Sequence, residues 1–77
     1  MKIKTATGKE LECNAITSVP TPPTLYLHLS RTSMPLAWAI FGNQDELPID
    51  GYNEFTKLEY IIDEGQNGSR VTLSKSE

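Results

Sequence analysis

The segment Leu25–Phe41 constrains the fold most, because a strand pattern leads directly into a helix pattern. Residues 25–29 read LYLHL, so leucines alternate with Tyr26 and His28. A period of two places successive side chains on opposite faces of a strand. We therefore predict a central strand whose leucines face the core and whose Tyr26 and His28 side chains are partly exposed or covered.

Residues 33–41 carry the helix pattern. Ser33 is a suitable N-cap, and Pro35 falls in the first turn, where proline is tolerated. Gly42 or Asn43 is expected to end the helix in left-handed geometry. A helix of about two to three turns does not persist alone in water, so it must pack on the sheet. The residues with the spacing of one helical face are Leu36, Ala37, Ile40 and Phe41.

Three aromatic residues are the predicted contact residues. Trp38 falls off the apolar face of the helix, so it either caps the edge of the core or is exposed for contact. The Tyr, Trp and Phe residues together exceed what the core of a domain of this size needs. Exposed aromatic side chains dominate the energetics of protein interfaces. We therefore expect Tyr26, Trp38 and Tyr52 to contribute to a contact patch.

Residues 1–17 predict a β-hairpin with its loop at Ala6-Thr7-Gly8. Gly8 would take the left-handed position of a turn with a bulge. The register then places Ile3 opposite Leu11 and Lys4 opposite Glu10. Apolar residues meet apolar residues and opposite charges meet, an agreement that a slip of one residue would destroy.

Residues 18–24 contain Pro20, Pro22 and Pro23. Proline cannot donate a ladder hydrogen bond, and it holds the chain extended. We therefore predict a stiff connector between the first hairpin and the central strand. The alternative is a proline-rich ligand for a recognition module.

A second hairpin is predicted near the end of the sequence. Asn67-Gly68 is the strongest signal for a two-residue hairpin turn in the chain. A turn there would place Ile62 opposite Leu73 and Glu64 opposite Val71.

Together these elements predict one domain, residues 1–77, of the α+β class. We expect an antiparallel sheet of about five strands with one short helix, residues 33–41, packed on one face. A chain of 77 residues buries a modest core. The expected core residues are Ile3, Leu11, Cys13, Leu25, Leu27, Leu29, Leu36, Ile40, Phe41, Leu58, Tyr60, Ile62, Val71 and Leu73.

Composition argues against several classes of protein. No run approaches the roughly 18 apolar residues of a membrane helix, and no apolar segment follows the charged first residues, so no signal peptide is predicted. A single cysteine favours a reducing compartment. Residues 45–64 are acidic, with Lys57 as the only base, which argues against nucleic acid as a partner. This segment is either a solvated rim or an electrostatic docking surface.

The sequence also lacks a recognisable catalytic or metal-binding pattern. His28 is the only histidine and Cys13 the only cysteine, which is too few for a metal-ligand set. The glycines form no phosphate-binding loop, and no serine lies in a nucleophile elbow. The chain is therefore predicted to be no enzyme and to hold no metal or cofactor. Catalysis would require a pocket that gathers His28, Cys13 and at least one of Asp45, Glu46 and Asp50.

Several short motifs lie between residues 25 and 75: Phe41-Gly42-Asn43, Gly51-Tyr52, Phe55-Thr56, Leu58 and Val71-Thr72-Leu73-Ser74-Lys75. With these motifs, residues 25–75 resemble small proteins encoded in phages and prophages of Gram-positive bacteria, commonly near tail genes. The resemblance implies a virion-associated or assembly-assisting role, and it carries no activity onto individual residues. The hairpin KTATGKE also resembles the first hairpin of ubiquitin-like β-grasp domains, although the rest of the chain departs from that pattern.

The expected function is therefore that of a non-enzymatic protein acting through protein–protein contacts in phage virion (tail) structure or assembly. Its partner would be another protein or a second copy, because open sheet edges invite strand addition. The alternative is a cytoplasmic regulatory binding module that recognises a host protein or a small ligand. The expected location is the cytoplasm or the virion, with neither nucleic acid nor membrane as a partner.

Overall fold

The computed structural model describes residues 1–75, without the side chains of Gln44 and Asn67. Within this range the chain forms six strands and one α-helix, a small α+β fold. The strands are β1 (Lys2–Lys4), β2 (Glu10–Glu12), β3 (Ala15–Pro20), β4 (Pro23–Leu29), β5 (Lys57–Asp63) and β6 (Ser69–Ser74). The helix α1 spans Met34–Phe41, and the 3₁₀ turns are η1 (Arg31–Ser33), η2 (Gln44–Glu46) and η3 (Gly65–Asn67).

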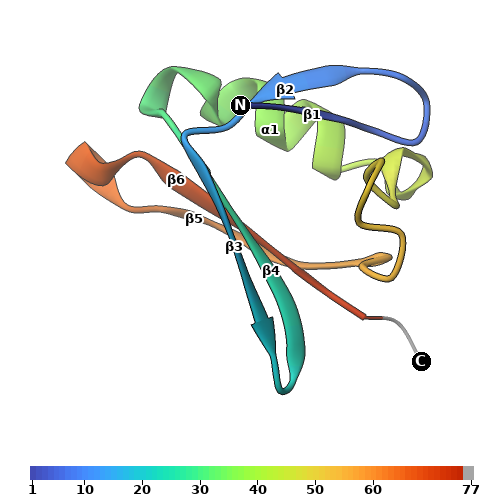
Figure 1. Ribbon diagram of the computed structural model, residues 1–77. Helices are drawn as coiled ribbons and strands as arrows, with labels where there is room; N and C mark the ends of the chain where they lie inside the picture. The colour runs from blue at the N-terminus through green and yellow to red at the C-terminus, as the bar shows by residue number, and fades with distance from the viewer. Residues whose placement is uncertain (76–77) are drawn as a thin grey trace.

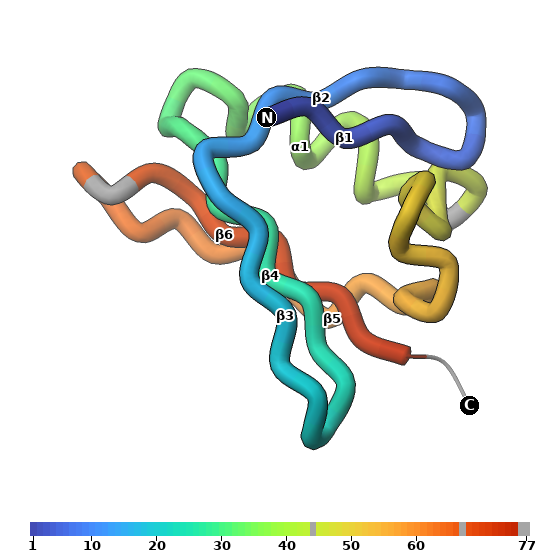
Figure 2. The backbone as a smooth tube through the Cα atoms, in the orientation of Figure 1, coloured from blue at the N-terminus to red at the C-terminus, as the bar shows by residue number. Residues whose placement is uncertain are grey.

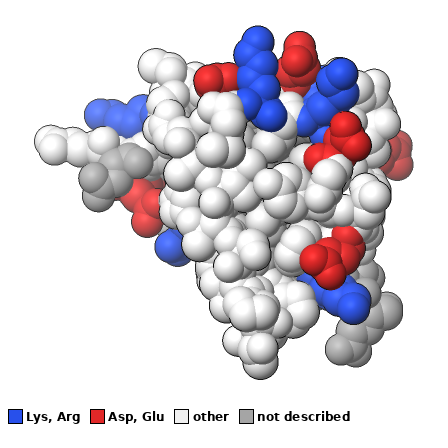
Figure 3. Space-filling model, in the orientation of Figure 1, with Lys and Arg blue, Asp and Glu red and all other residues white. Residues whose placement is uncertain are grey.

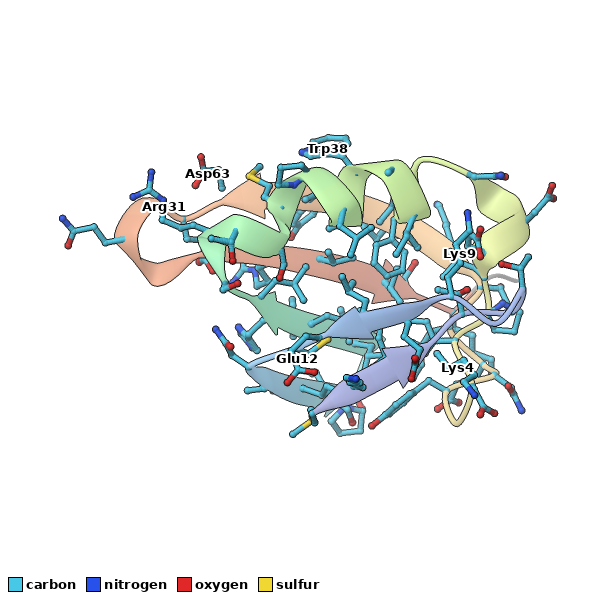
Figure 4. The ribbon with its side chains drawn as sticks, turned by 90° about the horizontal axis from the view of Figure 1, so that it is seen from above. Lys4, Lys9, Glu12, Arg31, Trp38 and Asp63 are labelled. Atoms are coloured by element: carbon cyan, nitrogen blue, oxygen red, sulfur yellow. The ribbon has the colours of Figure 1, made fainter. Side chains whose placement is uncertain are left out.

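The strands form two antiparallel sheets in place of the single sheet of about five strands that the sequence predicts. The larger sheet has the order β3-β4-β6-β5, and the smaller one is the β1–β2 hairpin. The hairpin and α1 lie side by side over one face of the larger sheet (Figure 1 and Figure 4). The other face of the larger sheet is left open.

The leucine face of β4 forms the centre of the core, as predicted. Leu25, Leu27 and Leu29 are all fully buried. Leu25 pairs with Leu73 and Leu27 with Val71 on the neighbouring strand β6. Five further residues that the sequence places in the core are also buried in the structure, namely Ile3, Leu11, Cys13, Ile40 and Phe41.

The first hairpin has the predicted register, with Ile3 opposite Leu11 and Lys4 opposite Glu10. Gly8 has a φ of +94°, which is the left-handed region that the turn requires. The hairpin stays separate from the larger sheet. The β-grasp arrangement, in which this hairpin would belong to the main sheet, is therefore not formed.

The predicted proline connector is wrong, because residues 15–29 form the β3–β4 hairpin. The ladder runs from Ala15 opposite His28 to Pro20 opposite Pro23, and the turn is Thr21-Pro22. Pro20 is the last residue of an edge strand and Pro23 is the first residue of β4, two places where a strand tolerates proline. The prolines therefore cluster at the turn without interrupting the pairing.

The second hairpin exists, but its predicted register is wrong. Ile62 lies opposite Arg70, where the Asn67-Gly68 turn would have placed it opposite Leu73. The loop is longer, and Gly65 and Gly68 both have positive φ. A Cβ at Gly68 would lie 2.0 Å from the backbone oxygen of Leu29, so this position requires glycine for close approach as well.

A bulge in β5 changes which of its residues face the core. The register shifts between Leu58 and Tyr60, so that Leu58 and Ile61 pack against the core. Tyr60 is 46% exposed and Ile62 is half-buried, although both were expected in the core. An extra residue in one strand reverses the alternation of side chains beyond it, and the sequence pattern does not reveal that reversal.

The helix α1 has the predicted extent but a narrower buried face. Ala37, Ile40 and Phe41 are buried, whereas Leu36, expected in the core, is 48% exposed. Gly42 has a φ of −69°, so the expected left-handed helix end is absent there. Ser33 occupies the N-cap position without making a side-chain cap bond. The core also contains Ala37, which was predicted on the apolar helix face, and two residues that were not expected there, Ile49 and Phe55.

Buried Glu46 joins the first hairpin to the loop after α1. Its side chain is 2% exposed and accepts hydrogen bonds from the hydroxyls of Thr5, at 2.7 Å, and Thr7. Lys9 Nζ lies 2.9 Å from Glu46 Oε2, and the Ala6 amide donates to the Glu46 carbonyl. The hydrogen bonds to its side chain lower the Glu46 pKa to about 2. The largest effect comes from the Thr7 hydroxyl, followed by the Thr5 hydroxyl and the Lys9 ammonium. Glu46 therefore stabilises the fold from within, although the acidic segment 45–64 to which it belongs was expected to be a solvated rim or a docking surface.

A pair of leucine substitutions tests the assignment of the core. Leu27→Ala should lower the free energy of unfolding by about 2–5 kcal/mol, because it leaves a cavity in the packed centre. Leu36→Ala, the matched control, should cost at most about 1 kcal/mol, because this leucine is half-exposed. Urea unfolding followed by Trp38 fluorescence measures both, and equal losses would contradict this placement.

The substitution Glu46→Gln tests the buried carboxylate. The folded-state pKa of about 2 lies below the ordinary value of 4.5, so the ionised group stabilises the fold above pH 4.5 and loses this effect as pH falls towards 2. The melting temperature of Glu46→Gln should therefore lie below that of the wild type at pH 7. The gap should narrow between pH 4.5 and 2, and a pH-independent gap would contradict the proposed ionisation.

Candidate protein-interaction surface

The three predicted contact residues lie on different parts of the molecule. Tyr26 is on the open face of the larger sheet, because it alternates with the buried leucines of β4. Trp38 is 52% exposed on α1, which covers the opposite face (Figure 4). Tyr52 belongs to the loop before β5 and packs against the core. The structure does not join them into one patch.

The edge strand β3 is the more continuous candidate surface. It is the first strand in the order β3-β4-β6-β5, so one of its edges has no strand partner among the described residues. It is six residues long, and its ladder with β4 runs without a register shift. Its side chains are exposed or half-buried. The backbone groups along this edge are therefore available to a further strand.

Charge is absent from this part of the chain. The segment Cys13–Ser30, which includes β3 and β4, contains no Asp, Glu, Lys or Arg. Figure 3 shows the result as an uncharged surface that runs from the middle of the visible face to the tip of the β3–β4 hairpin. Charged side chains gather above it and at its sides. Because burying a charge costs free energy, an uncharged edge meets a partner strand with the least penalty.

The opposite edge of the same sheet differs in each of these respects. Strand β5 carries Lys57, Glu59 and Asp63, and its register shifts at the bulge between Leu58 and Tyr60. Lys57 Nζ lies 3.7 Å from Glu59 Oε1. Bulges, charged side chains and prolines are devices by which natural sheets protect an edge from further pairing. The β5 edge is therefore protected along its length, whereas β3 carries one such device, Pro20, at its last position.

The open face of the sheet holds a second candidate surface, a hollow around Thr72. Thr17, Tyr26, Thr72 and Tyr60 lie opposite one another across the four strands. Thr72 is 3% exposed, and its hydroxyl has no hydrogen-bond partner in the part of the chain that the structure describes. The Arg70 guanidinium lies 5.3 Å from the centre of the Tyr26 ring. The surface is a hollow lined by two tyrosines together with Lys57, Glu59 and Lys75.

The residues required for catalysis are not gathered at one place. His28 is on the open face, where its Nε2 lies 3.2 Å from the Thr17 hydroxyl. Cys13 belongs to the core on the other side of the sheet, where burial raises the pKa of its thiol to about 11. Glu46 is engaged with the first hairpin. Among residues 1–75, no three His, Cys, Asp or Glu side chains lie close enough together to hold a metal ion.

Comparison with known proteins adds no further assignment. No protein-family model, curated protein or solved structure matches this chain. No helix in the described part of the chain is both long and apolar enough to cross a membrane.

The sequence contains a signal for the β3 strand, although the neighbouring prolines led to the prediction of a connector. Ile16 and Val19 are β-branched residues in an uncharged segment, a composition typical of a strand. Pro20, Pro22 and Pro23 favoured a connector instead. The run from Cys13 to Ser30 without a charged residue marks the surface, and it is visible without a structure.

Two threonine substitutions test the unpartnered hydroxyl on the open face. Thr72→Val should leave the free energy of unfolding unchanged or raise it by up to about 1 kcal/mol, because it replaces a buried hydroxyl that has no partner. Thr5→Val is the matched control, since Thr5 is equally buried at 3% but bonds to Glu46. It should clearly destabilise the fold. Urea unfolding measures the free energy of unfolding of both variants. A loss of more than about 1 kcal/mol for Thr72→Val would show that the Thr72 hydroxyl has a partner in solution.

Proposed function

We propose that this protein is non-enzymatic and acts through protein–protein contacts made by strand addition at the β3 edge. The observation that carries the proposal is an uncharged and regular edge strand with no strand partner in the described chain. We further propose that these contacts serve the structure or assembly of a phage-type particle. That setting is supported by the resemblance of residues 25–75 to small phage and prophage proteins.

Strand addition fits this edge because backbone hydrogen bonds provide the affinity and alternate side chains provide the selectivity. The side chains of Thr17 and Val19 would point to one face of the extended sheet, and those of Ile16 and Ser18 to the other. These side chains are small or β-branched and uncharged, so a partner strand of similar composition would pack beside them.

A binding module is the second candidate function, and the hollow around Thr72 favours it. A hydroxyl buried without a partner is costly, and a ligand that reached it would relieve that cost. Tyr26 and Tyr60 would offer such a ligand aromatic surface, and Lys57, Glu59 and Lys75 line the same hollow with charged groups. This candidate predicts a small molecule or peptide on the open face, whereas the first predicts a strand at the edge.

Site-specific photo-cross-linking tests the first proposal. A photoreactive phenylalanine analogue at position 18, on the exposed β3 edge, should give a discrete cross-linked protein product in cells that produce the protein. The same analogue at position 53, an exposed loop position away from β3, is the matched control and should give none. Absence of a product from position 18, or the same product from both positions, would overturn the proposal.

A further inference from the structure

We propose that the partner at the β3 edge is a second copy of this chain, which pairs antiparallel with β3 and joins two sheets into one. This inference rests on the proposed function, because it names the partner of the same edge. The order of the joined sheet would be β5-β6-β4-β3 followed by β3-β4-β6-β5 of the second copy. The two copies would be related by a two-fold axis perpendicular to the sheet, passing between Thr17 of one copy and Thr17 of the other.

The sequence of β3 suits antiparallel pairing with itself. With Thr17 opposite Thr17 of the second copy, Ile16 lies opposite Ser18 and Ala15 opposite Val19. Residues directly opposite one another point to the same face, so each pair joins a small residue or a hydroxyl to a β-branched side chain. No charged residue lies opposite another anywhere along the joint.

The distribution of charge permits a second copy at this edge. The chain has a net charge of −3, so two copies repel each other over most orientations. An edge suited to an oppositely charged partner would carry charge of its own to attract it. The β3 edge carries none, and the charged residues of the sheet lie on β5 and, as Arg70, on β6. Two like-charged copies can meet at this edge without bringing their charged strands together.

The shape of the molecule leaves this edge accessible. The end of the β3–β4 hairpin extends beyond the layer that α1 and the β1–β2 hairpin form over the sheet (Figure 1 and Figure 2). In an antiparallel pair, the projecting end of one β3 lies beside the covered end of the other. The covering layers of the two copies are thereby placed at opposite ends of the joint.

The size of the contact predicts a weak dimer. A strand of six residues is about 20 Å long. One pair of such strands buries less surface than the roughly 1,200–2,000 Å² of stable interfaces. We therefore expect a monomer–dimer equilibrium that shifts with protein concentration.

Sedimentation equilibrium with charge-swapped variants tests the inference. The wild type should show a weight-average mass that rises with concentration towards that of a dimer. Ser18→Lys and Ser18→Glu should each raise the dimer dissociation constant at least tenfold, because the two positions 18 are diagonal neighbours across the joint, about 7–8 Å apart, and would carry like charges. An equimolar mixture of the two variants should dimerise again, because opposite charges then meet across the joint. A misfolded variant could not give this recovery.

Asn53→Lys is the control, because it adds the same charge at an exposed loop position and should dimerise as the wild type does. A wild type that stays monomeric up to about 1 mM, which corresponds to about 4 kcal/mol of binding free energy, would overturn the inference. So would a dimer that Ser18→Lys leaves intact, or a mixture that stays monomeric. Cross-linking of a different protein at position 18 alongside a monomeric wild type would leave the proposed function standing. Absence of any cross-link would overturn that function itself.

Discussion

The leucine face of β4 is the constraint on which the rest of the structure depends. Leu25, Leu27 and Leu29 are fully buried, and two unlike elements cover them. The β1–β2 hairpin and α1 are each too small to be stable alone, because a two-stranded hairpin and a short helix lack an internal core. Both therefore depend on the apolar surface that β4 presents together with β6.

Buried Glu46 holds one of these covering elements in place. It receives hydrogen bonds and an ion pair from the turn of the first hairpin, and its low pKa follows from those contacts. A buried carboxylate is tolerated here because two hydroxyls donate to it and the Lys9 ammonium lies beside it. The first hairpin is thus fixed by apolar contact along its strands and by polar contact at its turn.

The same uncharged segment supplies both the core strand and the proposed contact edge. Residues 13–30 contribute β4, where the absence of charge permits burial, and β3, where it leaves an edge without electrostatic protection. On the other side of the sheet, β5 combines a bulge with Lys57, Glu59 and Asp63. This asymmetry between the two edges, more than any single aromatic residue, is the basis of the proposed contact at β3.

The sequence by itself determined the elements whose local pattern agrees with their burial: the first hairpin with its register, the leucine strand and the extent of α1. It also contained the uncharged run that marks the β3 edge, although the prolines directed the prediction elsewhere. Only the tertiary structure decided the β5 bulge, the exposure of Tyr60 and Leu36, and the burial of Glu46. The reason is physical, since a local pattern records which faces of an element are apolar. Whether a bulge reverses that pattern, or a carboxylate finds donors, depends on residues far away in the chain.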